Sequence, residues 1–234
     1  MIRKYKICDL IVECDFRFET MLSRSEKFAF DTEKEADITI GYDKKHHEFL
    51  LKNAENFTEK DCEVMSTGKK FYNELLNFDG FMLHSSAVMV DGKVFLFSAP
   101  SGTGKSTHTR QWRKLFGERA VIINDDKPAI RIVDGKIYAY GTPWSGSSEL
   151  NSTDFGILQG ICVLSRSEEN YIRPLDQSKA IFSVLNQTIR PADEKKMDKL
   201  LAVLDKVVSG VKIWQMGCNI STDAAQLAYD AMSK

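Results

Sequence analysis

Short apolar runs, bounded by polar turns, predict a chain built from many short strands and fewer helices. In the first third, "ADITIGYD" and "HHEFLLKNAENF" have this pattern and predict strands. The following segment, "GKKFYNELLNFDG", places Phe71, Leu75 and Leu76 at helical spacing and closes with Asp79-Gly80, a helix stop signal. We therefore expect residues 1–67 to form a strand-rich extension of a main domain that spans residues 68–234. We interpret this extension as an acceptor-binding or homo-oligomerisation element, or as an addition to the sheet of the main domain.

Two hairpins are predicted in the middle of the chain. The runs "MLHSSAVMV" and "KVFLFS" flank Asp91-Gly92, and "PAIRIV" and "KIYAYG" flank Asp134-Gly135, the same turn dipeptide. Between the hairpins we expect a helix from about Lys105 to Phe116, ended by Gly117, and then the short buried strand "AVIIN".

The last third mixes strands and helices. "ILQGICVL" and "VKIWQM" predict strands, and residues 222–232 predict a final helix. "DEKKMDKLLAVLDKVVSG" predicts a helix with Gly210 just past its end. Since hairpins flank the helix at Lys105 on both sides, the predicted fold class is α/β with a mixed sheet rather than a parallel one. One further helix, "DQSKAIFSVLNQTI", has an apolar face made of Ala180, Ile181, Val184, Leu185, Thr188 and Ile189.

The stretch "APSGTGKS" matches the spacing of a phosphate-binding loop, with Ala99 in place of the first glycine. It follows an apolar strand and opens a helix, which is the context that such a loop requires. Glycine backbones can approach a phosphate closely, and amides at a helix N-terminus favour an anion. Lys105 would reach the β- and γ-phosphates, and the hydroxyl of Ser106 or Thr107 would contact Mg²⁺. The alternative is a Gly/Ser-rich turn before a helix. The predicted nucleotide-binding residues are Ala99, Pro100, Ser101, Gly102, Thr103, Gly104, Lys105, Ser106 and Thr107.

An acidic pair, Asp125 and Asp126, follows the strand "AVIIN". Active sites gather at the carboxyl ends of strands in open sheets, and adjacent strand residues face opposite ways. One carboxylate of the pair can therefore hold Mg²⁺, directly or through water, while the other accepts the proton of an incoming hydroxyl as general base. The alternative is a surface turn, because Asn-Asp-Asp before Lys-Pro is also good turn chemistry.

Three further features carry weaker signals. His84 lies in the strand expected to pair with the strand before the loop, where it could contact phosphate or assist proton transfer, or simply pack. The segment from Tyr140 to Asn151, "YGTPWSGSSELN", could close over a nucleotide or acceptor. The alternative is a plain surface loop, but such a loop would expose Trp144, which is unusual. Within it, Glu149 is a candidate second metal ligand. His46 and His47 are interpreted as solvated loop residues.

Composition then excludes several classes of function. The formal net charge is -1 over 234 residues, which argues against a general nucleic-acid binder. The cysteine count of 5 is odd and includes no Cys-x-x-Cys pair, so free thiols in a cytoplasmic protein are expected. Acidic residues interrupt the apolar N-terminal run, which makes it a poor signal peptide, and no stretch approaches the roughly 20 apolar residues of a membrane span.

Taken together, "LHSSAVMVDGKVFLFSAPSGTGKST" and "INDDKP" resemble the catalytic domain of HPr kinase/phosphorylase. That resemblance implies a fold of the phosphoenolpyruvate carboxykinase type, Mg²⁺-ATP, and phosphoryl transfer to a serine hydroxyl. By position it implies that Lys105 contacts phosphate, Ser106 binds the metal, Asp126 takes the acceptor's proton and His84 is an active-site histidine. The family's Glu-x-Arg-Gly stretch has no clear counterpart, and its later arginine has three candidates, Arg166, Arg173 and Arg190.

The predicted function is therefore an ATP-dependent kinase acting on a protein or peptide hydroxyl, with Asp126, Lys105 and His84 as catalytic residues. A second hypothesis is a non-catalytic ATP-binding regulator that acts through a partner. A carboxykinase-like decarboxylase ranks last, because the chain looks too short for that family's extra substrate-binding elements.

Overall fold

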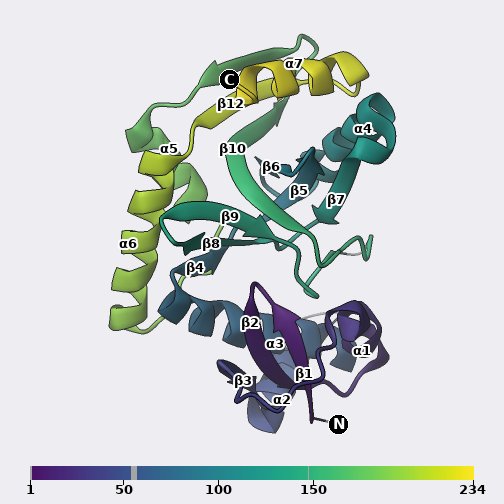
Figure 1. Ribbon diagram of the computed structural model, residues 1–234, viewed down its shortest axis with the longest axis vertical. Helices are drawn as coiled ribbons and strands as arrows, with labels where there is room; N and C mark the ends of the chain where they lie inside the picture. The colour runs from purple at the N-terminus through teal and green to yellow at the C-terminus, as the bar shows by residue number, and fades with distance from the viewer. Residues whose placement is uncertain (1, 54–56, 147) are drawn as a thin grey trace.

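The computed structural model describes residues 2–53, 57–146 and 148–234. Within these ranges, nine strands form one mixed sheet, with three more in a separate small sheet below it (Figure 1). The predicted α/β class with a mixed sheet is confirmed. The strands of the large sheet are β4 (Gly80–Met82), β5 (Ser85–Val90), β6 (Lys93–Ser98), β7 (Ala120–Asn124), β8 (Ala129–Val133), β9 (Lys136–Tyr140), β10 (Phe155–Arg166), β11 (Tyr171–Pro174) and β12 (Ile213–Cys218).

The long strand β10 organises the large sheet. Along one edge it pairs in parallel with β6, and β6 continues the sheet to β5 and β7. Its other edge is shared, because the first residues pair with β9 and residues Ile161–Arg166 pair in parallel with β12. Three neighbouring strands, β6, β10 and β12, therefore point their carboxyl ends the same way, and the functional residues described below gather at that edge.

Both predicted hairpins are confirmed, with Asp91 and Asp134 in the left-handed region at φ of 51° and 49°. The strand predicted from "MLHSSAVMV" is broken, however. β4 ends at Met82 and pairs with β8, whereas β5 begins at Ser85 and pairs with β6 and β7. His84 therefore lies in the connection between two strands and not within a strand.

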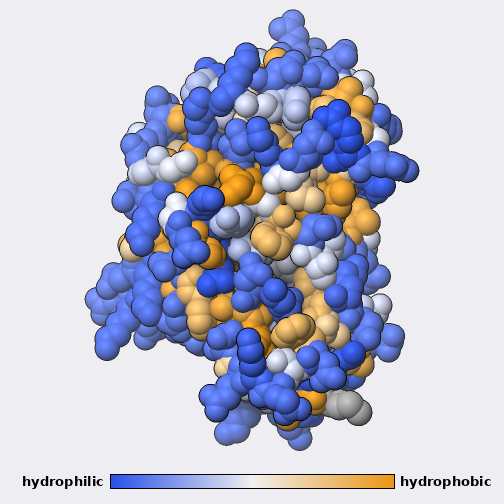
Figure 2. Space-filling model, in the orientation of Figure 1, coloured by the Kyte–Doolittle hydropathy of each residue, from blue (hydrophilic) through white to orange (hydrophobic). Residues whose placement is uncertain are grey.

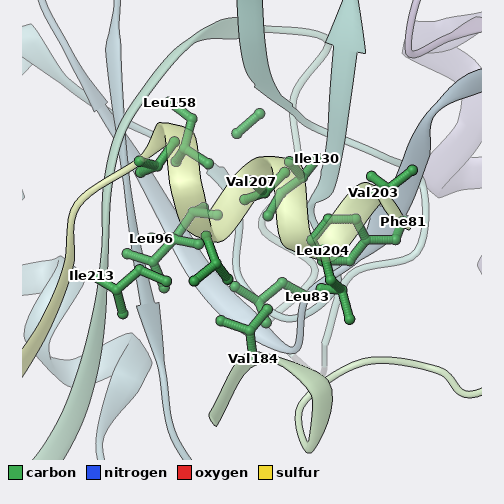
Figure 3. Close-up of a cluster of buried hydrophobic side chains, with 14 of the residues drawn as sticks. Phe81, Leu83, Leu96, Ile130, Leu158, Val184, Val203, Leu204, Val207 and Ile213 are labelled. Carbon is green, nitrogen blue, oxygen red and sulfur yellow. The ribbon is translucent and has the colours of Figure 1, made fainter. Parts of the chain in front are cut away.

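Helices cover both faces of the large sheet, because its strands are apolar on both sides. Val94 and Leu96 of β6 face α5 (Gln177–Leu185) and α6 (Glu194–Gly210), in the cluster of Figure 3. Phe95 and Phe97 face the opposite side, against Trp112 of α4 (Lys105–Phe116) and the alanines of α7 (Thr222–Met232). The predicted bounds of α4 and α7 are confirmed, whereas α5 stops before Thr188 and α6 includes Gly210.

The N-terminal part is a compact unit built on its own sheet. Strands β1 (Ile2–Ile7), β2 (Leu10–Asp15) and β3 (Ile38–Ile40) form a three-stranded sheet, so this part is not an addition to the large one. Its helices are α1 (Glu19–Ser25), α2 (Lys44–Asn53) and the first half of α3 (Glu59–Leu75), with a short 3₁₀ turn at Glu26–Phe28. Two further 3₁₀ turns lie outside this part, at Leu76–Phe78 and Gly117–Arg119. The expected boundary between residues 67 and 68 falls inside α3, which runs continuously through it.

The strand predicted in "ADITIGYD" is confirmed as β3, but the one predicted in "HHEFLLKNAENF" is wrong. The described part of that stretch belongs to helix α2, which begins at Lys44, because Asp43 accepts hydrogen bonds from the backbone N–H groups of His46 and His47 and caps it; residues 54–56 of this stretch lie outside the described residues. His47 is buried and stacks on Phe18, so it is not a solvated loop residue. Helix α3 begins earlier than predicted, at a capping box formed by Thr58 and Asp61.

The visible surface is mostly hydrophilic, with apolar side chains scattered among polar ones (Figure 2). Exposed large apolar side chains come from separate elements, including Phe49 of α2, Phe182 of α5 and Ile220 before α7. Among the described residues, no helix has both the length and the apolar character to cross a membrane.

Trp144 joins the N-terminal part to the large sheet, and it is fully buried rather than exposed. Its ring stacks on Phe71 of α3 with centroids 4.6 Å apart, and its indole N–H donates to Thr67 Oγ1 at 3.1 Å. Gly68 permits this approach, since a Cβ there would lie 2.9 Å from Trp144 Cδ1. The loop from Tyr140 to Asn151 is thus anchored by α3, apart from residue 147, which lies outside the described residues.

We expect Trp144→Ala to lower the free energy of unfolding by about 3–5 kcal/mol, because it opens a cavity between the two parts of the molecule. Urea unfolding followed by circular dichroism measures this. The matched control is Phe182→Ala, a truncation of an aromatic side chain that is 65% exposed, which should change stability by about 0.5 kcal/mol or less. Equal effects of the two substitutions would contradict the anchoring role.

Candidate functional site

The loop between β6 and α4 has the backbone of an anion-binding turn. Gly102 and Gly104 adopt φ of 78° and 119°, in the region that favours glycine, and Gly104 is the N-cap of α4. A glycine cap brings no side chain to the first N–H groups of the helix. The loop thus leaves amide donors and the positive end of a helix dipole toward a neighbouring cavity.

Lys105, the first residue of α4, is buried, with its ammonium donating to the Ala99 carbonyl oxygen at 2.9 Å. Burial lowers the pKa of Lys105, and the nearby carboxylates of Asp126 and Asp125 oppose that effect. The ammonium is therefore held inside the loop by one neutral acceptor, and an incoming anion would be a stronger partner.

A cavity of about 420 Å³ brings most of the predicted site residues together. The N-terminal end of α4, the acidic pair after β7 and His84 all line this cavity. Ala99, Pro100 and Thr103 do not line it. The predicted residues that do are His84, Ser101, Gly102, Gly104, Lys105, Ser106, Thr107, Asp125 and Asp126.

The two adjacent carboxylates lie in the turn after β7 and have different surroundings. Asp125 is buried, and its two carboxylate oxygens accept hydrogen bonds from the hydroxyls of Ser86 and Ser148, both at 2.7 Å. Ser86 in turn lies 2.9 Å from Thr109 on α4. Neutral hydroxyls therefore orient Asp125, and none of these contacts is an ion pair.

Asp126 is instead paired with two basic side chains. His84 Nε2 lies 3.2 Å from its Oδ1, and Lys127 Nζ donates to its Oδ2. Burial by itself would raise the pKa of Asp126, but the hydrogen bond from His84 and the charge of Lys127 outweigh burial and hold that pKa at about 2. Asp126 is therefore an ionised carboxylate whose basicity its neighbours suppress.

His84 is positioned by Gln187, which follows α5. The His84 backbone N–H donates to the Gln187 backbone carbonyl oxygen at 2.7 Å, and the ring nitrogen His84 Nδ1 lies 3.1 Å from Gln187 Oε1. The sequence analysis missed both Gln187 and Lys127. Lys127 could have been noticed, because it follows the acidic pair directly. Gln187 is separated from His84 by 103 positions, and no local pattern connects them.

Asn124, the last residue of β7, fixes the turn that carries the acidic pair. Its side chain is fully buried, and its Oδ1 accepts from the N–H groups of Asp126 and Lys127 at 2.9 and 2.7 Å. Its Nδ2 donates to the carbonyl oxygens of Thr142 and Trp144 at 3.0 and 3.3 Å. One amide thus ties the acidic turn to the loop that Trp144 anchors.

Glu149 does not join the acidic pair. Its carboxylate is 63% exposed and lies 3.2 Å from Arg24 Nη2 of α1. The same guanidinium donates to the carbonyl oxygens of Ser145 and Gly146. In the described parts of the chain, no group of three or more His, Cys, Asp or Glu side chains could hold a metal ion. The neighbouring hydroxyl of Ser148, rather than Glu149, reaches Asp125.

Of the three arginine candidates, Arg166 lies at the loop. Its guanidinium donates to the carbonyl oxygens of Gly102 and Thr103 at 2.6 and 3.3 Å. Arg173 instead contacts Gln215 on the neighbouring strand. Because β10 ends at Arg166, the register of the parallel strands brings this cation to the loop.

The family of the chain follows from its sequence. The model of the SynChlorMet cassette protein ScmC family matches residues 50–199, more than half of the chain, and the chain therefore belongs to that family. No curated protein matches it. Among solved structures, the Hpr(Ser) kinase/phosphatase from Coxiella burnetii matches with a TM-score of 0.38 and 8% identity, covering 64% of this chain and 95% of that chain. The expected resemblance is thus present as a distant structural likeness, which carries no information about activity.

A buried histidine on α4 gives a pH prediction. Burial lowers the pKa of His108 from 6.5 to about 4. The unfolded chain therefore takes up this proton at higher pH than the folded protein, and the free energy of unfolding falls as pH drops from 6.5 to about 4. The loss contributed by this group should reach about 3 kcal/mol.

Urea unfolding at several pH values measures this slope in wild type and in His108→Gln, which keeps an acceptor for Trp112 but does not titrate. The variant should lose less stability than wild type over that range. The contribution of Asp126 lies in a separate window, since its lowered pKa costs stability only as pH falls below 3.8 toward about 2. Parallel losses in both proteins above pH 4 would contradict the assignment to His108.

Proposed function

We propose that this ScmC-family protein is a kinase that transfers the γ-phosphoryl group of Mg²⁺-ATP to a hydroxyl, most readily a serine of a protein or peptide. One observation carries the proposal: a single cavity is lined by the N-terminus of α4 with Lys105 and by Asp125 and Asp126. Anion-binding donors on one wall and carboxylates on the other are the two halves that phosphoryl transfer to a hydroxyl requires.

The loop from Ala99 to Thr107 would hold the phosphates. Its amides and the α4 dipole favour negative charge, and Lys105 can exchange the Ala99 carbonyl for a phosphate oxygen by a small movement. Since the charge of a transferring phosphoryl group spreads over its oxygens, an ammonium held in this position stabilises the transition state by electrostatics.

The donor set fits Mg²⁺, which prefers oxygen ligands and is held by one or two carboxylates together with phosphates and water. Ser106 and Asp125 line the same cavity, and neutral hydroxyls orient the Asp125 carboxylate. These two residues would hold the ion. When bound, Mg²⁺ neutralises charge on the phosphates.

Asp126 would act as the general base. The acceptor O–H bond breaks with its proton passing to the Asp126 carboxylate, the oxygen forms a bond to the γ-phosphorus, and the bond from that phosphorus to the β-phosphate bridging oxygen breaks to release ADP. Lys127 suppresses the basicity of Asp126 in the structure. Incoming phosphates would draw Lys127 away, which leaves Asp126 more basic when substrate is present.

The pairing of Asp126 also supports a second candidate, the ATP-binding regulator. Both oxygens of this carboxylate already have basic side chains as partners, and a site that never releases them would bind nucleotide without turnover. Phosphate transfer separates the two candidates.

We expect Asp126→Asn to bind Mg²⁺-ATP as wild type does and to lose about 100- to 10,000-fold in transfer, the contribution typical of a general base. The assay is transfer from γ-labelled ATP into proteins and peptides of a native cell lysate, with ATP binding measured separately by calorimetry. Asp134→Asn, a substitution of the same type in an exposed hairpin turn, is the matched control and should leave both readouts unchanged. Transfer by Asp126→Asn at the wild-type rate would exclude the base role, and ATP binding without transfer by wild type would favour the regulator.

Gln187 should act as a positioning residue through His84. We expect Gln187→Leu to lower kcat by about tenfold or more with the KM for ATP unchanged, because a misplacement of about 1 Å can cost about 100-fold. Gln187→Glu keeps an acceptor for His84 and should restore most of kcat. A merely structural role would instead give similar losses in both variants, accompanied by lower thermal stability.

A further inference from the structure

We propose that a second cavity, on the other side of the loop, binds the nucleoside half of the nucleotide. This inference rests on the proposed function, since it assumes that phosphates occupy the loop from Ala99 to Thr107. The cavity has a volume of about 790 Å³, and its walls are the loop with the start of α4, the end of β10 with its following turn, and the end of β12. Nothing in the sequence patterns pointed to it.

The position of the cavity follows from the sheet. β6, β10 and β12 are neighbouring parallel strands, with Ser98 beside Val163 and Arg166 beside Cys218 in register. Their carboxyl ends therefore open onto one crevice, and ligands of open α/β sheets bind in such crevices. The loop continues β6, so a nucleotide held by the loop has this crevice directly beside it.

The two cavities meet at the loop and differ in character. Both include Gly102, Gly104 and Thr107 in their walls, so a molecule can extend from one to the other around the loop. The first contains the acidic pair and His84, which suits phosphates and an acceptor hydroxyl. The second holds no aspartate and is large enough for a nucleoside, since small-molecule sites range from about 300 to 1,000 Å³.

The walls of the second cavity offer an apolar surface beside polar groups, as a base and a ribose require. Ile220 is 77% exposed, the most exposed large apolar side chain among the described residues, and it lies in this wall beside Cys218. A flat aromatic base would cover part of this side chain. Glu168 and Asn219 add polar groups at the same edge for the ribose hydroxyls.

His108 adds a second, independent observation. It is buried, lines the cavity, and accepts the indole N–H of Trp112 at its Nε2, 3.1 Å away. The imidazole is neutral near pH 7, so its proton lies on Nδ1. That Nδ1 is buried without a hydrogen-bond partner in the described structure. A buried donor without a partner costs free energy, so the wall at His108 holds a polar group whose hydrogen bonding is incomplete.

The far wall is preformed. Asn219 Nδ2 donates to the Glu168 carbonyl oxygen at 3.0 Å, and the Asn219 N–H donates to Asn170 Oδ1 at 2.9 Å. Ser221 Oγ donates to Asn219 Oδ1 at 2.6 Å, and the Ser167 N–H donates to the Cys218 carbonyl oxygen. A wall held in this way loses little conformational entropy when a ligand binds.

The test compares ATP with inorganic tripolyphosphate, which has the phosphates but no nucleoside. Calorimetry with Mg²⁺ measures both ligands on wild type, on Ser167→Trp, which fills the cavity, and on Ile220→Asp, which places a charge on its exposed apolar wall. Ile220 is exposed, so its substitution does not endanger folding. Ser209→Trp, at an exposed position of α6, is the matched control. Thermal unfolding checks that every variant folds.

We expect both cavity variants to weaken the affinity for ATP at least tenfold and to leave the affinity for tripolyphosphate unchanged. Ser209→Trp should bind both ligands as wild type does. Wild-type ATP affinity in Ile220→Asp and in folded Ser167→Trp would overturn the nucleoside site while leaving the proposed kinase intact. Equal losses for ATP and tripolyphosphate would also overturn it, because the substitutions would then act on the loop. Failure of wild type to bind either ligand would overturn this site and the proposed function together.

Discussion

The buried side-chain amide of Asn124 is the interaction on which the site depends. It satisfies two backbone N–H groups of the acidic turn and two carbonyl oxygens of the loop that follows β9. An amide buried this completely must have all these partners, because each unsatisfied polar group in the interior costs about 1–3 kcal/mol. The acidic turn and the loop can therefore not move independently, and the positions of Asp125 and Asp126 follow from that coupling.

The N-terminal part extends the same coupling to the surface. The Trp144 ring packs between Phe71 of α3 and Phe16, which follows β2. Arg24 and Lys27 donate hydrogen bonds to carbonyl oxygens of the same loop. Residues that carry no recognisable chemistry in the sequence thus hold the loop that borders the acidic pair. This gives the N-terminal part a structural role in the site, although it contributes none of the residues that line the cavity of the acidic pair.

The partners of the two carboxylates distinguish them. Asp126 is paired with the basic side chains of its neighbours, whereas Asp125 is oriented by neutral hydroxyls. Lys105 is likewise held by a single carbonyl oxygen inside the loop. A carboxylate held by hydroxyls suits a cation, and an ammonium held by one neutral acceptor suits an anion. Ligand binding would then replace weak internal contacts with stronger ones, at little cost in conformational entropy.

Much of the fold was predictable from local patterns. The Asp-Gly turns, the glycine after α4 and the period of the apolar residues predicted both hairpins, α4, α7 and the mixed sheet, because each of these signals acts over a few residues. The errors lie where a local pattern was ambiguous. Asp43 and the Thr58–Asp61 box begin helices that a short apolar run had suggested were strand or loop.

For the site, the sequence by itself determined which chemical groups are present and their order: a glycine-rich loop, a lysine at a helix start, and two adjacent carboxylates after a strand. Only the tertiary structure decided which of them meet. It placed Glu149 against Arg24, brought Gln187 to His84, buried Trp144, and opened a cavity between the ends of strands far apart in the chain. The physical reason is that strand pairing and core packing join residues across long sequence separations, whereas turn chemistry and periodicity report only on near neighbours.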